Sequence, residues 1–334
     1  MKVLFIGGTG IISSAVSKLA VEKGIDLYLF NRGQHSEFVP KGAKVIKGNI
    51  EDKSAFAKTL KGKTFDVVVD WRAYVPKDVE ADIKLFKGSV GQYIFISSAS
   101  AYQKPVTYWL ITESTLMANP YWQYSRDKIA CEDRLIAEYR DNGFPVTIVR
   151  PSLTYGVTMI PAAINSWPKP WTIVDRMRKG KKVIIHGDGT SLWVMTHNTD
   201  FAKGFIGLIG NIQAIGQAFH ITSDEVLTWN QIYQAIADAA GVKLNAVYIS
   251  SDFIIKIDPE HIGTLLGDKT CSEVFDNSKI KRFVPDFVAT VPFVQGVKCS
   301  IEWFEADKSR CVVDTDYSRF MDRTIAAYEK ALPK

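Results

Sequence analysis

The sequence is poor in the residue types that build metal sites and disulfide frameworks. Its 334 residues include four cysteines and five histidines. No Cys-x-x-Cys pair occurs, and the histidines have no metal-ligand spacing, so we expect no metal and no disulfide scaffold. Reduced cysteines of this kind are typical of the cytoplasm, where we expect the protein to be located.

Long apolar runs and a strong charge imbalance are also missing. No run approaches the roughly 18 apolar residues of a membrane span, and the apolar stretch before Gly7 is too short for a signal peptide. The 41 basic and 36 acidic residues leave a net charge of +5, which is too mild to indicate nucleic acid by itself. With 46% hydrophobic residues and no repeats, the composition predicts a soluble globular protein without a membrane partner.

The first 30 residues contain the strongest local pattern. An apolar run (2–6) is followed by glycines, by a segment with helical character (11–23) and by a second apolar run (26–30). This strand-turn-helix-strand order is typical of a dinucleotide-binding fold, in which glycines let the backbone approach a pyrophosphate at a helix N-terminus. The expected cofactor contacts here are Gly7, Gly8, Thr9, Gly10, Ile11 and Ile12.

Further apolar runs alternate with helical segments as far as residue 149. Strands are expected at 44–46, 65–69, 92–96 and 144–149, and helices at 54–60, 78–86 and 121–139. Such alternation predicts an α/β fold with a doubly wound parallel sheet of the Rossmann type. Ligands bind at the carboxyl ends of the strands of these sheets, and the segment Ser97–Tyr102 falls at one such end.

The pattern loosens after residue 158, where prolines and tryptophans become frequent. We expect a dinucleotide-binding domain over 1–158, completed by part of 195–224. A smaller C-terminal α/β substrate domain is expected over 159–194 and 225–334. Helices are expected at 171–178 and after His197 and Thr228, and strands at 183–185 and 217–221.

Two features suggest the cofactor and the chemistry. Arg32 follows the second strand, where an arginine accommodates the 2′-phosphate of NADP and an acid would favour NAD. NADP is therefore slightly favoured, with NAD left open. Tyr124 and Lys128 lie four residues apart on one helix face, and a nearby ammonium favours a tyrosine phenolate.

Together these residues resemble the extended short-chain dehydrogenase/reductase superfamily, the NAD(P)-dependent epimerase/dehydratase group. The resemblance rests on the glycine turn, the Ser97–Tyr102 segment, Tyr124 with Lys128 and Glu132, Arg150-Pro151 and Asp276–Arg282. It implies that Ser98 holds the substrate oxygen, Tyr124 is the general acid-base, and Lys128 binds the nicotinamide ribose while lowering the tyrosine pKa. Further implied cofactor contacts are Asn31, Asn49, Ile50 and Pro151; implied substrate contacts are Ser100, Tyr102, Trp193 and Arg282.

The implied activity is hydride transfer on a sugar-like or other small hydroxyl or carbonyl substrate by an oxidoreductase, epimerase or dehydratase. Leu153 and Trp193 stand where nucleotide-sugar enzymes of the group carry an asparagine and an arginine, so a nucleotide-sugar substrate is in doubt. Ser13 replaces the usual third glycine, and Arg72 lies in a turn that is normally small and apolar.

A second resemblance, through 30–33 and 65–70, is to an atypical branch that includes chloroplast stem-loop RNA-binding proteins. An RNA-binding or regulatory protein on the same scaffold is therefore the alternative function. The basic run 176–182 is the feature that favours it, although a solvated helix end explains that run more simply. Because this chain keeps Ser98, Tyr124 and Lys128, we favour the enzyme, with a homodimer formed through the helices at 78–86 and 121–139.

Overall fold

The apolar runs of the first half of the chain form a single parallel sheet. The computed structural model describes residues 1–333 and shows seven strands in the order β3-β2-β1-β4-β5-β7-β12, all parallel. The strands are β1 (Lys2–Ile6), β2 (Asp26–Asn31), β3 (Lys44–Lys47), β4 (Val67–Asp70), β5 (Gln92–Ile96), β7 (Val146–Arg150) and β12 (Ala218–His220). The chain starts in the middle of the sheet, winds to one edge and then crosses back to β4. This arrangement confirms the predicted doubly wound Rossmann fold and puts the switch point between β1 and β4.

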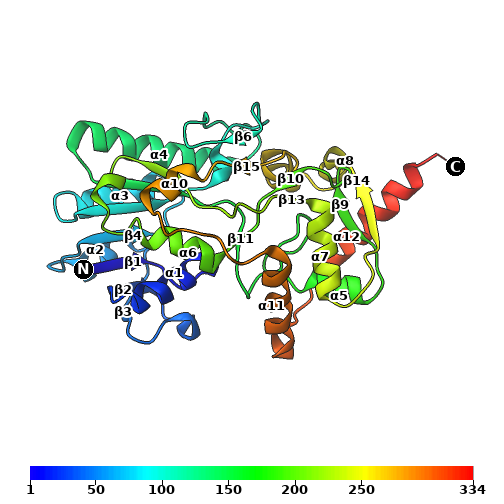
Figure 1. Ribbon diagram of the computed structural model, residues 1–334, viewed down its shortest axis with the longest axis horizontal. Coiled ribbons are helices and arrows are strands. Elements are labelled where there is room, and N and C mark those ends of the chain that lie inside the picture. Colours follow the sequence, from blue (N-terminus) through cyan, green and yellow to red (C-terminus); the bar gives the residue numbers. More distant parts are fainter. Residues whose placement is uncertain (334) are drawn as a thin grey trace.

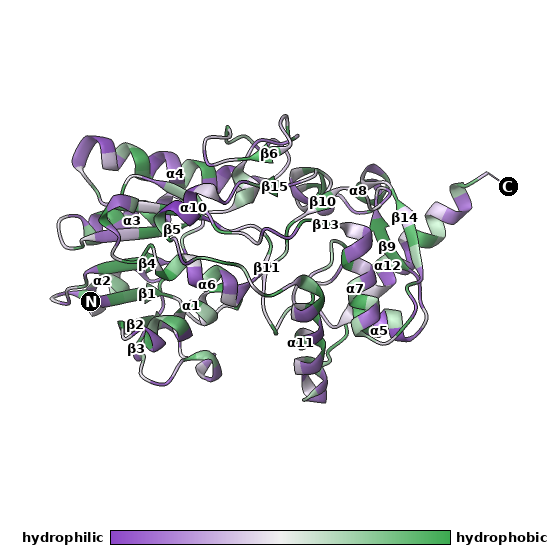
Figure 2. Cartoon of the chain, in the orientation of Figure 1, coloured by the Kyte–Doolittle hydropathy of each residue, from purple (hydrophilic) through white to green (hydrophobic). Residues whose placement is uncertain are grey.

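Alternate residues of each central strand supply the two faces of this sheet. Val3 and Phe5 of β1 pack on one face, and Leu4 and Ile6 pack on the other. The first face is covered by α1 (Ile11–Glu22), α6 (Asn198–Ile206) and α10 (Ser278–Phe283), and the second by α2 (Lys53–Leu60), α3 (Pro76–Phe86) and α4 (Gln123–Asn142). Burying each large apolar side chain contributes about 1.5–3 kcal/mol, so this continuous apolar sheet is the main source of stability in the lobe. The apolar strands lie inside the lobe in Figure 2.

A second, smaller lobe has its own hydrophobic core (Figure 1). A pair of parallel strands, β9 (Val183–His186) and β14 (Ala246–Ile249), lies among helices. These are α5 (Thr172–Arg178), α7 (Trp229–Ala239), α8 (Ser251–Ile257), α9 (His261–Thr264), α11 (Phe293–Glu305) and α12 (Thr315–Ala331). Trp229 and Trp193 are among its fully buried side chains. The second lobe is therefore α/β, as predicted.

Short elements complete the chain. Three pairs of two-residue strands are β6 (Leu110–Ile111) with β15 (Val274–Phe275), β8 (Thr154–Tyr155) with β11 (Thr196–His197), and β10 (Leu192–Trp193) with β13 (Leu227–Thr228). The 3-10 turns are η1 (Ser36–Phe38), η2 (Ala99–Ala101), η3 (Ile212–Ala214) and η5 (Lys308–Arg310), and η4 (Leu265–Lys269) is a π-helical turn.

The division between the lobes follows packing more closely than chain order. Ile280 and Phe287 pack in the same cluster as Val3 and Phe5 of the sheet. The segment that contains α10 therefore returns to the first lobe, although the sequence places it in the stretch expected to form the second domain. Over residues 1–333, no helix has the combined length and apolar character needed to cross a bilayer.

Candidate functional site

The turn after β1 is shaped by glycine. Gly7 and Gly8 have φ angles of 102° and 101°, which residues with a Cβ rarely adopt. A Cβ on Gly8 would lie 2.6 Å from Leu29 Cδ2, so a side chain there is also excluded by the neighbouring strand. Gly10 then caps α1, whose first turn contains no acid, leaving the helix N-terminus suited to an anion.

Ser13 takes the place of the usual third glycine without opening the turn. Its Oγ accepts a hydrogen bond of 2.9 Å from the Gly10 amide, and its side chain is buried. One turn further on, Ser17 Oγ donates to Gly8 O at 2.8 Å. The two hydroxyls therefore fasten the first turn of α1 to the glycine segment.

A cavity of about 740 Å³ lies over this turn at the carboxyl ends of the strands. Its volume is within the range of small-molecule and cofactor sites. The expected cofactor residues that line it are Gly7, Gly8, Thr9, Gly10, Ile11, Asn31, Arg32, Asn49 and Ile50. Asn31 Oδ1 accepts a hydrogen bond from the Gly33 amide at 2.8 Å, which fixes the loop after β2. An elongated cavity over a glycine turn and a helix N-terminus fits a dinucleotide.

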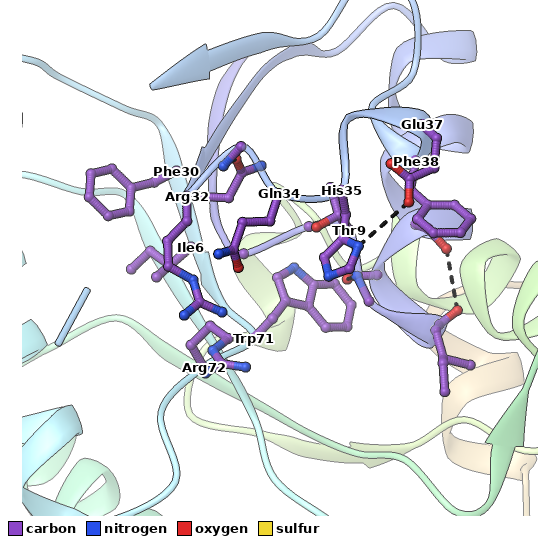
Figure 3. Close-up of a pocket in the computed structure, with 18 of the residues that line it drawn as sticks. Ile6, Thr9, Phe30, Arg32, Gln34, His35, Glu37, Phe38, Trp71 and Arg72 are labelled. Atoms are coloured by element: carbon purple, nitrogen blue, oxygen red, sulfur yellow. Dashed lines mark hydrogen bonds and ion pairs between the residues drawn. The ribbon is translucent and has the colours of Figure 1, made fainter. Parts of the chain in front are cut away.

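Two arginines point into this cavity. Arg32 and Arg72 are labelled near each other in Figure 3, with Gln34 and Trp71 beside them. Neither guanidinium forms a salt bridge within residues 1–333, and the stem of Arg72 packs over Gly7. From the sequence, Arg72 is only a departure from the usual small residue of this turn. Its position beside Arg32 depends on how the loops after β2 and β4 meet, which the sequence does not show.

A second cavity of about 570 Å³ continues from the first. The two share Gly10, Ile11, Ser13, Trp71 and Tyr74. The remaining expected cofactor residues, Ile12, Lys128 and Pro151, line this second cavity together with Ser98, Ser100 and Tyr124. The expected catalytic set therefore lies in one continuous cleft with the glycine turn.

Three serine hydroxyls form a chain that ends at the proposed catalytic site. Ser125 Oγ donates to Ser100 Oγ at 2.8 Å, and Ser100 Oγ lies 2.8 Å from Ser98 Oγ. Since Ser100 Oγ already accepts a hydrogen bond from Ser125, its own proton is free to point at Ser98. The Ser98 hydroxyl can then donate to an oxygen in the cavity. Ser125 was missed in the sequence because its role depends on the η2 turn approaching α4.

Lys128 does not act on Tyr124 in the way the sequence suggested. Its Nζ donates to Ala73 O at 2.6 Å and to Ile96 O at 2.7 Å, and lies 5.8 Å from the centre of the Tyr124 ring. Burial raises the pKa of Tyr124 to about 12, while a hydrogen bond with Ser98 opposes this rise. The expected lowering of the tyrosine pKa by Lys128 is therefore wrong for this state, because desolvation outweighs the other contributions. Burial also lowers the pKa of Lys128 to about 8.

Asp70 fixes the turn that contains Ala73, whose carbonyl accepts the hydrogen bond from Lys128. Its Oδ1 accepts from the amides of Arg72 and Ala73, at 2.5 and 2.9 Å. Burial, followed by the neighbouring Asp70, raises the pKa of Asp82 well above its ordinary value. The Asp70 side chain thus fixes the backbone of Arg72 and of Ala73, whose carbonyl accepts a hydrogen bond from Lys128.

Three of the four residues expected to bind substrate do not line the cleft in this structure. Tyr102 is fully buried, and its hydroxyl lies 3.0 Å from His220 Nδ1. Trp193 is 1% exposed and packs against Trp229, with ring centres 5.4 Å apart. Arg282 is exposed on α10 and lines neither cavity. Only Ser100 of this set lines the cleft, so this structure gives no support to substrate binding by the other three.

The second lobe supplies cleft residues that the sequence did not indicate. Asp268, Lys269 and Glu273, in and after η4, line the second cavity. Trp303 and Arg310, around η5, line the first. These segments are far from the glycine turn in sequence, so only the packing of the two lobes reveals their position. Within residues 1–333, no group of three His, Cys, Asp or Glu side chains is arranged to hold a metal ion.

The basic run 176–182, which begins in the last turn of α5, is largely neutralised by acidic side chains of the second lobe. Arg176 is buried and pairs with Asp322 at 2.7 Å, and Lys181 reaches the same carboxylate at 2.9 Å. Arg178, Lys179 and Lys182 pair with Glu305, Asp175 and Glu329. The sequence favoured a solvated helix end for this run. In the structure the run instead forms an intramolecular network of ion pairs.

A doubly wound sheet, a glycine turn at a helix N-terminus and a continuous cleft at the strand ends define a dinucleotide-binding α/β protein. Residues 3–222, about two thirds of the chain, match one family of this class. The chain belongs to the NAD dependent epimerase/dehydratase family.

Individual relatives agree with this assignment. The chain is 25% identical over 253 residues to the chloroplast stem-loop binding protein of 41 kDa b of Arabidopsis thaliana, covering 72% of this chain and 63% of that protein. It is 30% identical over 169 residues to UDP-glucose 4-epimerase of Lactobacillus helveticus, covering 45% and 51%. It therefore matches only about half to two thirds of the length of these relatives.

The fold is also similar to solved structures. The structure of dTDP-glucose 4,6-dehydratase from Bacillus anthracis, in complex with NAD, superposes with a TM-score of 0.73 at 19% identity. The match covers 93% of this chain and 98% of that one. The likeness thus extends over both lobes of the fold.

Proposed function

We propose that the protein is an NAD(P)-dependent oxidoreductase, epimerase or dehydratase that acts on a small hydroxyl or carbonyl compound. The observation that carries this proposal is the convergence of Ser98, Tyr124 and Lys128 in a cavity continuous with the one over the glycine turn. Bound nicotinamide supplies the capacity to accept or donate hydride. The family and the enzymatic relatives support the same class of chemistry.

In this proposal each polar side chain has a defined task. Ser98, supported by Ser100 and Ser125, donates a hydrogen bond to the substrate oxygen. The Tyr124 hydroxyl exchanges a proton with that oxygen as the carbon is oxidised or reduced. Lys128 has one N–H beyond its two bonds to backbone carbonyls, which is available for a ribose hydroxyl of the cofactor.

NADP is the favoured cofactor. Its 2′-phosphate carries a charge that needs cations, and Arg32 and Arg72 are both exposed, unpaired within residues 1–333 and directed at the same cavity. Charge-assisted bonds between arginine and phosphate are among the stronger hydrogen bonds in proteins. Asn31, where NAD enzymes often carry an acid, brings no repulsion.

The test is a calorimetric titration of the protein with NADP and with NAD. We expect tighter binding of NADP. Arg32→Ala and Arg72→Ala should each reduce this preference by about 10- to 100-fold, the effect of a lost bond worth roughly 1.5–3 kcal/mol. Lys18→Ala, on the outer side of α1 and 73% exposed, is the control. Equal affinities in the wild-type protein, unchanged by either arginine variant, would contradict the NADP preference.

Nucleotide-sugar substrates are disfavoured. Leu153 lines the second cavity, which contains no arginine among its lining residues. An unpaired buried diphosphate would be costly. Saturable binding of UDP that raises the thermal unfolding temperature would contradict this part of the proposal.

The alternative function is RNA binding, which the name of the Arabidopsis relative suggests for that protein. Against it, the basic run 176–182 is engaged in ion pairs within the second lobe. Submicromolar binding of structured RNA by a protein that fails to bind either dinucleotide would favour this alternative over the enzyme.

A further inference from the structure

One wall of the second cavity carries three charged side chains that the proposed hydride chemistry does not use, Asp268, Lys269 and Glu273, and Lys104 pairs with the last of them. All four side chains are at most 8% exposed. The three lining residues share the cavity with Ser98 and Tyr124. Buried charges are expensive unless they are paired, so this wall calls for an explanation.

The four charges cancel one another. Lys104 Nζ pairs with Glu273, both side chains being almost fully buried, and Lys269 Nζ pairs with Asp268 Oδ2 at 2.8 Å. The other cation of the cavity, Lys128, is bonded to two backbone carbonyls. A phosphate or diphosphate would therefore find the cations of this wall already neutralised by carboxylates, and its own charge would remain uncompensated there.

The backbone that carries Asp268 and Lys269 is fixed by three separate contacts. Asn119 Nδ2 donates to Gly267 O at 2.7 Å, and the Trp229 indole N–H donates to Lys269 O at 3.2 Å. His186 Nε2 lies 2.9 Å from the same carbonyl. The π-helical turn η4 is thus preorganised, and π-helical turns are frequent at functional sites.

Aromatic side chains complete the cavity. Trp122 lies beside Tyr124, with ring centres 5.0 Å apart, and lines the cavity together with Trp167. Trp167 is 61% exposed, which is unusual for so large an apolar side chain and places it at the cavity opening. These indoles offer flat apolar faces next to a donor and an acceptor.

We infer that this cavity binds an unphosphorylated polyhydroxyl compound, a free sugar or polyol. Two neighbouring hydroxyls of this ligand form hydrogen bonds with Asp268 and Lys269. This inference rests on the proposed function and names its substrate class. One hydroxyl donates to the Asp268 carboxylate while the next accepts from the Lys269 ammonium, so the ligand joins the ion pair without breaking it. The C–H face of the ligand packs against tryptophan, and the reacting hydroxyl or carbonyl remains free for Ser98 and Tyr124.

The experiment uses the full-length protein saturated with NADP and a panel of free aldoses, ketoses and polyols. Sugar phosphates, UDP- and dTDP-sugars and aliphatic keto acids form the comparison set. Binding is measured by saturation-transfer NMR and by the shift in thermal unfolding temperature, neither of which requires turnover. We expect ligands only in the free sugar and polyol group, and Asp268→Asn or Lys269→Met should weaken their binding by about tenfold or more.

Matched variants separate ligand recognition from folding. Asp268→Asn combined with Lys269→Met removes both charges at once, so no unpaired buried charge remains if a single variant fails to fold. Asp252→Asn, on the exposed side of α8, is the control and should bind like the wild type. NADP affinity should be unchanged in all of these variants.

Two results would overturn the inference while leaving the oxidoreductase proposal intact. One is preferential binding of phosphorylated, nucleotide-linked or aliphatic compounds by NADP-saturated protein. The other is undiminished sugar binding by the folded double variant. Failure of the wild-type protein to bind either dinucleotide is a different result, which contradicts the proposed function itself.

Discussion

The proposed chemistry depends most directly on the hydroxyl of Tyr124. General acid-base catalysis contributes roughly 10²- to 10⁴-fold, so Tyr124→Phe should lower turnover by about that factor. Its side chain shares a cavity with Ser98 and is not part of the hydrophobic core clusters, so folding and NADP affinity should be nearly unchanged. Steady-state assay of a substrate found in the sugar and polyol panel measures the first effect, and calorimetry measures the second. A Tyr124→Phe enzyme with wild-type turnover would refute the assigned role.

Lys128 should leave a signature in the pH dependence of stability. Burial lowers its pKa in the folded protein to about 8 from an ordinary value of 10.5. Between these values the unfolded chain binds the proton and the folded protein does not, so this group makes the free energy of unfolding rise with pH in that window. The free energy of unfolding of the wild type, minus that of Lys128→Met, should rise by up to about 3 kcal/mol as the pH increases from about 8 to about 10.5. Parallel pH profiles in urea denaturation would contradict the lowered pKa.

For individual residues, the sequence predicted which side chains lie near each other better than it predicted the hydrogen bonds that they form. The four-residue spacing on one helix correctly placed Lys128 near the Tyr124 ring. It could not show that the ammonium turns toward the carbonyls of Ala73 and Ile96, because those carbonyls come from the loop after β4 and from the end of β5. Trp193 illustrates the same limit, since only the packing of Trp229 against it shows that it is a core residue.

Helix α4 is joined to the sheet by a buried ion pair. Arg150 at the end of β7 donates to Glu132 through Nε at 3.0 Å and through Nη2 at 2.6 Å, and both side chains are at most 6% exposed. Removing one partner of such a pair leaves an uncompensated buried charge, so Glu132→Ala should destabilise the protein by about 3–5 kcal/mol in denaturant unfolding.

An exposed ion pair provides the control for this prediction. Lys18 and Glu22 on α1 lie 4.0 Å apart and are largely exposed, so Glu22→Ala should change stability by about 1 kcal/mol or less. The double variant Glu132→Met/Arg150→Met should recover much of the loss, because no buried charge remains unpaired. Similar effects of Glu132→Ala and Glu22→Ala would show that the buried pair does not anchor α4.

Elements differ in how far their own residues determine them. The strands β1, β4 and β5 are short apolar runs that are buried on both faces, so composition alone identified them. The π-helical turn η4 has no comparable signal. It exists because Gly263 and Gly267 bring the backbone against Trp122, where a Cβ on Gly263 would lie 2.3 Å from the indole. That contact joins parts of the chain about 140 residues apart, so local patterns could not predict it.

For the whole molecule, a two-fold homodimer through α3 and α4 stays a prediction. The two helices pack against each other on one face of the sheet, and Ile129 and Ile136 of α4 retain partial exposure. Light scattering at micromolar concentration should give the mass of a dimer. Replacing Ile129 and Ile136 together with lysine should then give a folded monomer. A wild-type protein that is monomeric in this range would contradict the prediction.

The two lobes build the proposed cofactor cavity together. Ile11, the first residue of α1, packs against the core of the second lobe, and within the first lobe its carbonyl accepts a hydrogen bond of 2.7 Å from Asn198 of α6. From the second lobe, Arg310 reaches the same cavity. Its guanidinium lies 4.0 Å from the centre of the Trp303 ring and donates to Trp303 O at 2.8 Å, and its Nε lies 3.7 Å from Asp307 Oδ2, which lines the same cavity. A cation held in this way is preorganised, so it loses little side-chain entropy when it meets an anion.

We therefore expect Arg310 to contribute to the binding of either dinucleotide through a phosphate that both possess. A lost charge-assisted hydrogen bond is worth roughly 1.5–3 kcal/mol, so Arg310→Ala should weaken NAD and NADP binding alike by about 10- to 100-fold. This pattern differs from that of Arg32→Ala, which should act mainly on NADP. Arg319→Ala, on the exposed side of α12, is the matched control. Calorimetric titration distinguishes three outcomes. Equal losses of NAD and NADP affinity would support a contact between Arg310 and the shared phosphates. Unchanged affinities would show that Arg310 contributes nothing, and a loss confined to NADP would show that it acts on the 2′-phosphate, so either result would contradict this role.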